Sequence, residues 1–438
     1  MEIFMRIYSV ALPILASSLV GLIALFINMG FIGQDNAFNL YIMGILLPIS
    51  FIVMSLNESL RVSSIAFASQ ASGDKKFNLF NDRLVTLILV SLAMYVLLNV
   101  LFYLIQQPFL SMYKVEPQHQ LFIGKFILHN LMVGVLAAVS MLCMSSLYGL
   151  GYAHSVSIIS ILSFAFNVAL TYVFVFHLKY GIYSIIYSTL ISSTIVLAIA
   201  LIWLKNIGAI SYFKVSSSAV QKAVIKIRNI SLPVLAGYGV MFMHVLVFNK
   251  LLAMFGPNDI AGFSVSHRLQ NIALMPAIAT GIAIAIHVNR LRSNNAADLS
   301  PSYIKTGVLS SFAIYFLISF VIFTFRESLI GLITSDADVI AAASKYLYYI
   351  GPTYFILGPL LVLLIFFEQT GKGVRSLIFN MLSFGLQLGV AFYVAYKYQS
   401  LDLVYTIIAA GYLITLFYIF YELRRSRQYY GSNQTQTI

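Results

Sequence analysis

Charged residues and cysteine are the clearest deficits of this 438-residue chain. Asp, Glu, Lys and Arg make up only 9% of the sequence, against about 25% in a typical soluble domain. Hydrophobic residues make up 60%, and the mean hydropathy is +0.92. This balance excludes a soluble globular domain. The single cysteine, Cys143, excludes an internal disulfide.

The chain also lacks the short motifs that mark common enzyme chemistry. It has no HExxH, no Cys/His metal spacing and no nucleophile elbow. The stretch QTGKGVRS holds a Gly-Lys pair, but Phe366 and Phe367 stand where the first P-loop glycine is needed, so ATP hydrolysis is not expected. The repeated filter or charged ring of a channel is missing as well. A secondary transporter, not an enzyme, is the class that remains.

Long apolar runs are what the chain has in abundance. A membrane-spanning helix needs roughly 20 such residues, and the runs do not alternate apolar and polar residues as barrel strands do. The predicted fold class is therefore an all-α membrane protein with twelve transmembrane helices. The predicted spans are about 7–33, 39–71, 84–106, 121–149, 154–177, 180–205, 230–255, 258–289, 305–327, 342–370, 374–398 and 400–423.

Membrane orientation explains the formal net charge of +12. With a cytoplasmic N-terminus and alternating spans, most Lys and Arg residues fall on the cytoplasmic side, as the positive-inside rule requires. The outer side holds only Lys114, Lys125, Lys179, Arg326, Lys345 and Lys397. An even number of spans places both termini in the cytoplasm. We expect a monomer in the cell membrane (the bacterial inner membrane), with the lipid bilayer but no nucleic acid as a partner.

Two motifs recur at one constant interval. LPILA at 12–16 returns as LPVLA at 232–236, and LSFAFN at 162–167 returns as LSFGLQ at 382–387, each pair 220 positions apart. The offset predicts a duplicated half of six spans. Two such halves have the same orientation and form parallel repeats. The predicted parts are an N-terminal lobe at 1–215, a cytoplasmic linker at 216–229, a C-terminal lobe at 230–423 and a disordered cytoplasmic tail at 424–438.

Six stretches, in order along the chain, carry a family resemblance. They are ALPILASSLVGLIALFINMGFIG (11–33), SIAFASQASGDKKFN (64–78), YGLGYAHSVSIISILSFAFNVALTYVFVF (148–176), SLPVLA (231–236), SHRLQNIALMPAIATGIAIA (266–285) and FEQTGKGVRSLIFNMLSFGLQL (367–388). Together they resemble the multidrug and toxic compound extrusion (MATE) family of the MOP flippase superfamily. The resemblance implies two homologous six-helix bundles in a V-shaped arrangement. It also implies an antiporter that exports amphipathic or cationic organic compounds in exchange for protons or sodium, with no bound cofactor.

The chain departs from the family where the coupling cation usually binds. Many members have Asp in the first span, five residues before Gly33, and this chain has Asn28 there. The fifth span commonly has an acid four residues after its Asn, but Asn167 is followed by Thr171. The seventh span lacks the usual acid and offers only His244. Because amides and hydroxyls do not take up protons near neutral pH, the cation site is either lost or rebuilt from neutral oxygens.

Three ionisable residues within the predicted spans are the candidates for coupling: Glu58, His244 and Glu368. Such groups are costly in lipid, which favours a functional role. Glu58 has Arg61 three residues on, so a structural ion pair competes with a proton-carrying carboxylate. Glu368 has Lys372 four residues on, and an interfacial structural role is its alternative. His244 titrates near neutral pH if it is accessible, but it can also be a buried histidine bonded to a carbonyl.

The resemblance also indicates which residues line a substrate cavity. Aromatic faces bind organic cations, and Tyr148, Tyr172 and Tyr238 fall on spans whose family counterparts face the central cleft. Gln70, from the second-span motif, and Arg268, from the eighth-span motif, are further candidates. Each tyrosine has a core or lipid-facing position as its alternative.

Two other functions fit the same sequence. A lipid-linked precursor flippase of the same superfamily would use Arg61 and Arg268 to bind a pyrophosphate. Against it, the chain has twelve spans rather than more, and the first span has no arginine. An exporter of one dedicated metabolite, such as a siderophore or peptide, has no sequence feature that separates it from a broad drug exporter.

Overall fold

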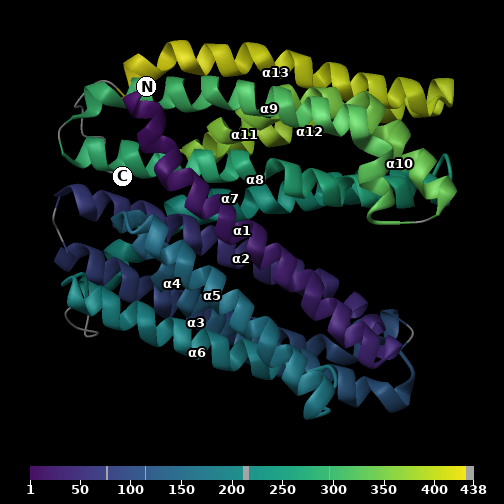
Figure 1. Cartoon of the computed structure of the whole chain (residues 1–438), viewed down its shortest axis with the longest axis horizontal. Helices are drawn as coiled ribbons and strands as arrows, with labels where there is room; N and C mark the ends of the chain where they lie inside the picture. The colour runs from purple at the N-terminus through teal and green to yellow at the C-terminus, as the bar shows by residue number, and fades with distance from the viewer. Residues whose placement is uncertain (75–76, 114, 211–216, 295, 335, 431–438) are drawn as a thin grey trace. The chain divides into compact units, whose positions relative to one another are not determined.

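In a computed structural model, the protein is built from long helices (Figure 1). The structure describes residues 1–74, 77–113, 115–210, 217–294, 296–334 and 336–430. Within these ranges, 12 helical segments are long and apolar enough to cross a membrane. The prediction of an all-α protein with twelve spans is therefore confirmed. Helices suit this composition because they pair their own backbone N–H and C=O groups where lipid offers no water.

Short connections link the helices in chain order. In the first half they are α1 (Glu2–Asp35), α2 (Ala37–Asp74), α3 (Phe77–Met112), α4 (Pro117–Leu150), α5 (Ala153–Tyr172), the π-helical turn η1 (Val173–His177) and α6 (Tyr183–Asn206). In the second half they are α7 (Ser217–Leu252), α8 (Pro257–Ser293), η2 (Ala297–Leu299), α9 (Ser300–Gly331), α10 (Ala337–Ile350), η3 (Gly351–Thr353), α11 (Tyr354–Gln369), α12 (Gly373–Tyr398) and α13 (Leu401–Tyr430).

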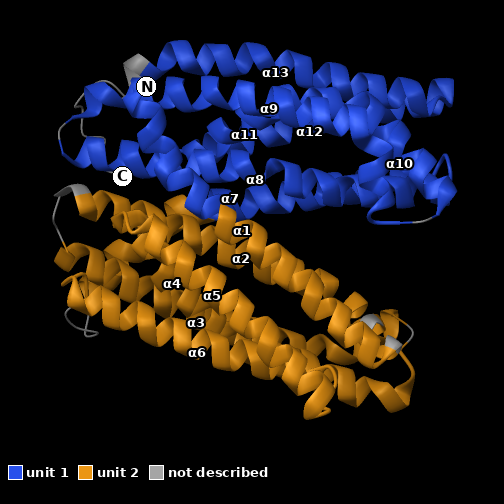
Figure 2. Ribbon diagram, in the orientation of Figure 1, with its two compact units in different colours: residues 1–15, 232–438 blue, residues 16–231 orange. Residues whose placement is uncertain are grey.

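The chain divides into two compact units, coloured separately in Figure 2. Unit 2 is the segment Ala16–Ser231, and unit 1 joins Met1–Leu15 to the chain from Leu232 onward. The predicted lobes assign residues 1–15 to the N-terminal half instead. The start of α1 groups with unit 1 because it bonds to that unit's helices: the Tyr8 hydroxyl lies 2.9 Å from the Ser310 hydroxyl on α9.

Two predicted non-spanning segments are helical where the structure describes them. Residues 217–229, which belong to the predicted cytoplasmic linker at 216–229, form the first turns of α7. Ala223, Ile227 and Ile230 are buried there, and their helical spacing explains why the helix extends so far. The tail prediction is wrong for residues 424–430, which continue α13. The remainder of the predicted tail, 431–438, lies outside the described residues.

Small residues let α2 and α4 pack closely in unit 2. A Cβ atom on Gly149 of α4 would lie 2.6 Å from the Ala68 Cβ and from the Ile65 carbonyl oxygen of α2. The hydroxyls of Ser64 and Ser146 are 2.8 Å apart across the same interface. Close backbone approach and hydroxyl bonds between helices are the usual means of helix association in lipid. These two helices therefore form a close-packed wall of unit 2.

In unit 1, α8 packs beside α10 and then beside α11. A Cβ on Gly262 would lie 2.7 Å from the Ala342 Cβ of α10, and a Cβ on Gly281 would lie 2.8 Å from the Ile365 Cβ of α11. In Figure 1, α10 lies at the right-hand end of this unit and α11 nearer its middle. One long helix thus contacts two shorter ones in succession.

The tenth predicted span, 342–370, is two helices rather than one. The turn η3, which contains Gly351 and Pro352, separates α10 from α11. Proline has no backbone N–H and interrupts the helical hydrogen-bond ladder. The sequence predicts a kink at Pro276 for the same reason, but α8 continues through that residue as one helix. The bend at Pro276 stays a prediction.

Candidate functional site

Three helices of unit 2 bring amide and hydroxyl side chains together in what we call the polar cluster: Asn28 (α1), Asn167 and Thr171 (α5), and Ser188 and Ser192 (α6). The Nδ2 atom of Asn28 donates to the Oδ1 atom of Asn167 at 2.8 Å. Asn167 in turn donates from Nδ2 to the Ser192 hydroxyl at 3.0 Å. The structure thus places the predicted pair Asn28 and Asn167 side by side, and their role in cation binding stays a prediction.

Thr171 and Ser188 complete the polar cluster. The Thr171 hydroxyl lies 2.8 Å from the Ser188 hydroxyl oxygen and 2.9 Å from the Asn167 carbonyl oxygen. Both Thr171 and Ser188 are fully buried. The π-helical turn η1 begins two residues after Thr171, and π-helical turns are frequent at functional sites. The cluster therefore sits at an irregular point of the fifth span.

One acceptor in the polar cluster lacks a donor. The Oδ1 atom of Asn28 is buried and has no hydrogen-bond partner among the residues that the structure describes. A buried polar atom left unpaired costs about 1–3 kcal/mol, so a cation or a donor placed beside this oxygen would be stabilised. The five side chains offer only neutral oxygens and amide N–H groups, which bind hard cations but do not take up protons near neutral pH.

Sequence reasoning missed the α6 side of this cluster, although a signal was present. Ser184, Ser188 and Ser192 recur every four residues, which places them on one face of a helix. All three are buried. A hydroxyl stripe on one face of an apolar span predicts a contact with polar groups on another helix, here Asn167 and Thr171.

Unit 2 also contains a cavity of about 370 Å³ between α2, α3, α4 and α6. This volume lies at the low end of the range for small-molecule sites, roughly 300–1,000 Å³. Its walls mix apolar residues such as Met54 with polar ones, and the polar lining residues are Ser50, Asn57, Glu58, Tyr95, Asn130 and Thr189. The Tyr95 hydroxyl donates to the Asn57 Oδ1 atom at 3.0 Å, which holds one wall in place.

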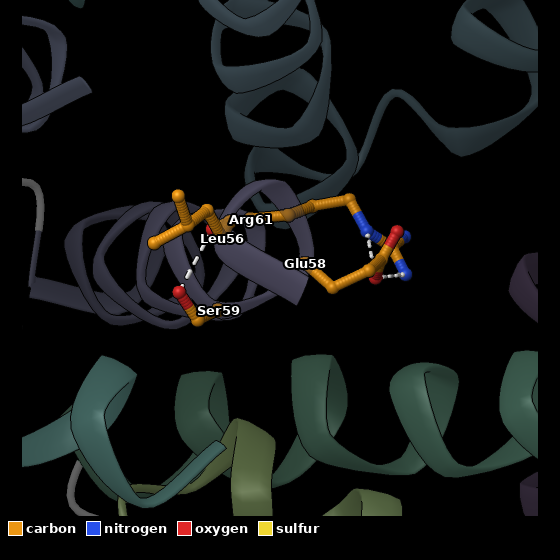
Figure 3. Close-up of polar contacts among 4 residues, drawn as sticks. All are labelled: Leu56, Glu58, Ser59 and Arg61. Atoms are coloured by element: carbon orange, nitrogen blue, oxygen red, sulfur yellow. Dashed lines mark hydrogen bonds and ion pairs between the residues drawn. The ribbon is translucent and has the colours of Figure 1, made fainter. Parts of the chain in front are cut away.

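Glu58 supplies the only carboxylate among the residues that line this cavity. Arg61, one turn further along α2, donates from Nε to the Glu58 Oε2 atom at 2.8 Å and from Nη2 at 2.5 Å. Figure 3 shows the two side chains meeting beside the helix. Both are partly exposed, at 25% for Glu58 and 21% for Arg61. The predicted ion pair is therefore formed, and its carboxylate also borders the cavity, whereas Arg61 does not line it.

The remaining predicted residues of unit 2 have structural partners. The Tyr148 hydroxyl lies 2.9 Å from the Ser17 hydroxyl and 3.0 Å from that of Ser157, so it joins α1, α4 and α5. Gln70 accepts a hydrogen bond from Arg83 at 3.3 Å. Tyr172 is 46% exposed and belongs to an aromatic group beside η1. None of these three lines the unit 2 cavity.

The predicted residues of unit 1 are spread over several helices. The His244 ring on α7 lies 4.4 Å from the Phe384 ring of α12. The Glu368 Oε1 atom on α11 accepts a hydrogen bond from the Ser376 hydroxyl at 2.9 Å. Tyr238 on α7 is half-buried, and Arg268 on α8 is exposed. In the described part of the chain, no group of three or more His, Cys, Asp or Glu residues is placed to hold a metal ion.

Comparison with known protein families matches most of the chain. The family model MatE matches residues 13–173 and again residues 233–393. The chain belongs to the MatE family. The two matched segments start and end 220 positions apart, the same interval that separates LPILA from LPVLA. This MatE protein therefore contains two copies of one family unit.

Two curated bacterial proteins are similar to parts of this MatE protein. The probable multidrug resistance protein NorM of Thermotoga maritima is 28% identical over 160 residues, which are 36% of this chain and 34% of that protein. The probable multidrug resistance protein YoeA of Bacillus subtilis is 19% identical over 252 residues, or 56% of this chain and 54% of that protein. The alignments therefore span about a third of the NorM protein and about half of the YoeA protein.

Solved transporter structures share the fold over nearly the whole length. The MATE transporter VcmN of Vibrio cholerae in its bent form has a TM-score of 0.88 at 19% identity, covering 98% of this chain and 99% of that one. A MOP superfamily transporter from Pyrococcus furiosus, described as having a binding pocket of reversed polarity, has a TM-score of 0.85 at 16% identity, covering 97% of both chains. At these identities the likeness establishes the fold.

Proposed function

We propose that this MatE protein is a secondary antiporter that exports amphipathic or cationic organic compounds in exchange for sodium or protons. Membership of a transporter family supports the general activity, and two similar proteins are named for multidrug resistance. The observation that carries the substrate class is the cavity in unit 2, where the Glu58 carboxylate borders a space of about 370 Å³ with a largely apolar wall. A carboxylate beside apolar surface suits an organic cation.

The neutral polar cluster supports sodium as the coupling ion at this site. Asn28 presents a buried oxygen with no donor among the described residues, and Thr171 and Ser188 add hydroxyl oxygens nearby. A sodium ion is satisfied by such oxygens, whereas a proton needs a group that titrates. Proton coupling would instead use Glu58, His244 or Glu368. Of these, the Glu58 carboxylate accepts a hydrogen bond from Arg61, and the Glu368 carboxylate accepts one from the Ser376 hydroxyl.

Reconstitution into vesicles tests the proposal directly. The purified protein would be placed in phosphatidylcholine–phosphatidylglycerol vesicles with ethidium on one side and an imposed sodium or pH gradient. We expect dye movement driven by the sodium gradient and lost when both gradients are collapsed. Dye movement unaffected by either gradient would reject the antiporter. Movement driven by the pH gradient alone would reject sodium coupling, and Glu58→Gln, His244→Ala and Glu368→Gln would then identify the proton carrier.

The placement of the protein in the cell follows from the same proposal. We propose a monomer in the bacterial inner membrane with both termini in the cytoplasm, because the Lys and Arg residues gather on the side of the N-terminus. Labelling of single cysteines at exposed positions in whole cells, with a reagent that does not cross membranes, tests this orientation. Labelling of a cysteine at position 2 from outside the cell would overturn it.

A further inference from the structure

The hydroxyl of Tyr315 on α9 lies within the backbone hydrogen-bond ladder of α8. It accepts the N–H of Ala277 at 3.0 Å and donates to the carbonyl oxygen of Ala273 at 2.9 Å. In an uninterrupted α-helix these two backbone groups bond each other. Pro276, the residue before Ala277, has no N–H to donate to the Ile272 carbonyl oxygen, so the ladder already lacks the neighbouring bond. A side chain of another helix therefore supports α8 at its weakest point, and an inserted side chain is a known cause of helix bending.

Ser319, also on α9, supports the backbone at the break between α10 and α11. It lies one helical turn beyond Tyr315 on α9. Its hydroxyl oxygen is 2.8 Å from the Gly351 carbonyl oxygen and 3.0 Å from that of Pro352. Because Tyr315 and Ser319 are one turn apart, the interruption in α8 and the interruption at η3 lie at nearly the same level of unit 1.

On one side of this level, the first arm of α8 (257–276) and α10 pack as one body, which we call body A. A Cβ on Gly262 would lie 2.7 Å from the Ala342 Cβ. The Ser266 hydroxyl donates to the Ala343 carbonyl oxygen at 3.3 Å. With so little space between the two helices, they cannot slide independently, and they have to move together.

On the other side, the second arm of α8 (277–293) and α11 form body B. A Cβ on Gly281 would lie 2.8 Å from the Ile365 Cβ, and the Asn289 Nδ2 atom donates to the Gln369 carbonyl oxygen at 3.1 Å. Most of this arm is buried, whereas before Pro276 only Gly262, Phe263 and Ser266 of α8 are buried. Body B is therefore embedded in unit 1, and body A is the freer of the two.

Tyr315 is fixed relative to body B. Its side chain is 1% exposed, and its ring lies against Gly358 of α11, where an added Cβ would come within 2.2 Å of the Tyr315 Cγ atom. The hydroxyl can therefore act as a stationary support for α8 beside Pro276.

We propose that unit 1 flexes at a hinge formed by Pro276 and Gly351–Thr353, with body A moving against body B, and that Tyr315 is the positioning residue that sets the resting bend of α8. The first arm of α8 is about 30 Å long at 1.5 Å per residue, so a change of about 10° at Pro276 displaces its far end by roughly 5 Å. Arg268 lies on this arm and moves with it. The hinge goes beyond the proposed function, because it operates whatever the substrate is.

Distances between paired spin labels on the full-length protein in vesicles test the hinge. The background variant is Cys143→Ala. One pair, on cysteines at Asn258 and Val374, spans the hinge from the start of α8 to the start of α12, beside the end of α11. The control pair, at Asn258 and Asp338, lies within body A. All three positions are exposed.

Tyr315→Phe, which removes only the hydroxyl, should shift or broaden the distance distribution of the 258–374 pair and leave the 258–338 pair unchanged. Ser319→Ala should act in the same direction and serves as the second variant. The matched control is Tyr354→Phe, because Tyr354 is equally buried in unit 1 and its hydroxyl has no hydrogen-bond partner among the described residues. An unchanged 258–374 distribution in both hinge variants overturns the proposal. So does an equal change in the control pair or in Tyr354→Phe.

Discussion

Asn28 and Asn167, 139 positions apart in the chain, share a hydrogen bond of 2.8 Å between the Nδ2 atom of one and the Oδ1 atom of the other. The bond fixes the orientation of both amides. It leaves the Asn28 Oδ1 atom as a buried acceptor without a donor among the residues described. A cation bound in the polar cluster would therefore be surrounded by neutral oxygens. None of the five side chains takes up a proton near neutral pH.

The first prediction concerns sodium dependence at the polar cluster. Thr171→Val keeps the shape of the side chain but removes an oxygen that lies 2.8 Å from Ser188. If sodium binds here, the sodium concentration for half-maximal export should rise about tenfold, equivalent to about 1.4 kcal/mol. Thr194→Val is the matched control, because the Thr194 hydroxyl bonds to its own helix and is exposed. Equal sodium dependence in the two variants would refute a sodium site in the cluster.

The second prediction concerns substrate charge. Glu58→Gln removes the carboxylate that borders the unit 2 cavity, and the KM for a cationic dye should rise by about tenfold, the loss expected when a charge-assisted contact is removed. The KM for an uncharged dye should change little. Arg61→Gln is the control, because it removes the ion-pair partner and keeps the carboxylate. A wild-type KM for the cation in Glu58→Gln would exclude this residue from substrate binding.

A third prediction tests packing in unit 1. Gly358→Ala would place a Cβ atom 2.2 Å from the Tyr315 ring, and overpacking of this kind typically costs about 1–3 kcal/mol. The apparent unfolding midpoint of the detergent-purified protein should fall. Gly385→Ala on α12 is the control, because a Cβ there meets nothing within 4 Å. Equal midpoints for both variants would contradict the close approach of α11 to Tyr315.

The fourth prediction concerns pH and stability. Lys372 lies in the turn between α11 and α12, where burial and then the charges of Arg375 and Arg292 lower its pKa from 10.5 to about 8. Between about pH 8 and pH 10.5 the unfolded chain keeps this proton and the folded protein has lost it, so this group makes stability rise with pH. Below pH 8 the group is charged in both states and adds no slope.

Lys372→Met removes this contribution. The unfolding midpoint of the variant should therefore rise less than that of the wild type between pH 8 and pH 10.5. Lys397→Met, at an exposed position at the end of α12, provides the comparison. A wild-type slope in Lys372→Met would mean that the Lys372 pKa is not lowered in the folded protein.

The length of the apolar runs and their lack of alternation were sufficient for the fold class. Twelve apolar runs with little charge have one stable arrangement in a bilayer, because each backbone must satisfy its own hydrogen bonds. The 220-residue interval between LPILA and LPVLA reappears in the two segments that the family model matches. The break at Pro352 was not predicted, because the tenth apolar run is continuous through it. Hydropathy measures composition and is insensitive to a missing backbone donor.

The sequence analysis predicted only part of the polar cluster. Asn28, Asn167 and Thr171 followed from the resemblance, and the serine stripe of α6 was readable from its four-residue spacing. Which helix the stripe faces depends on the rotation of α6 against α5, and only packing sets that rotation.

The role of Tyr315 depended entirely on the tertiary structure. In the sequence it is one tyrosine of 28, with no motif around it. Its hydroxyl reaches Ala273 and Ala277 only because Gly358 leaves room for the ring between α9 and α11. Periodicity along one chain determines which residues share a helix face. Contacts between atoms on different helices arise only when the helices pack, because side-chain volume and hydrogen-bond geometry then decide the rotation and height of each helix.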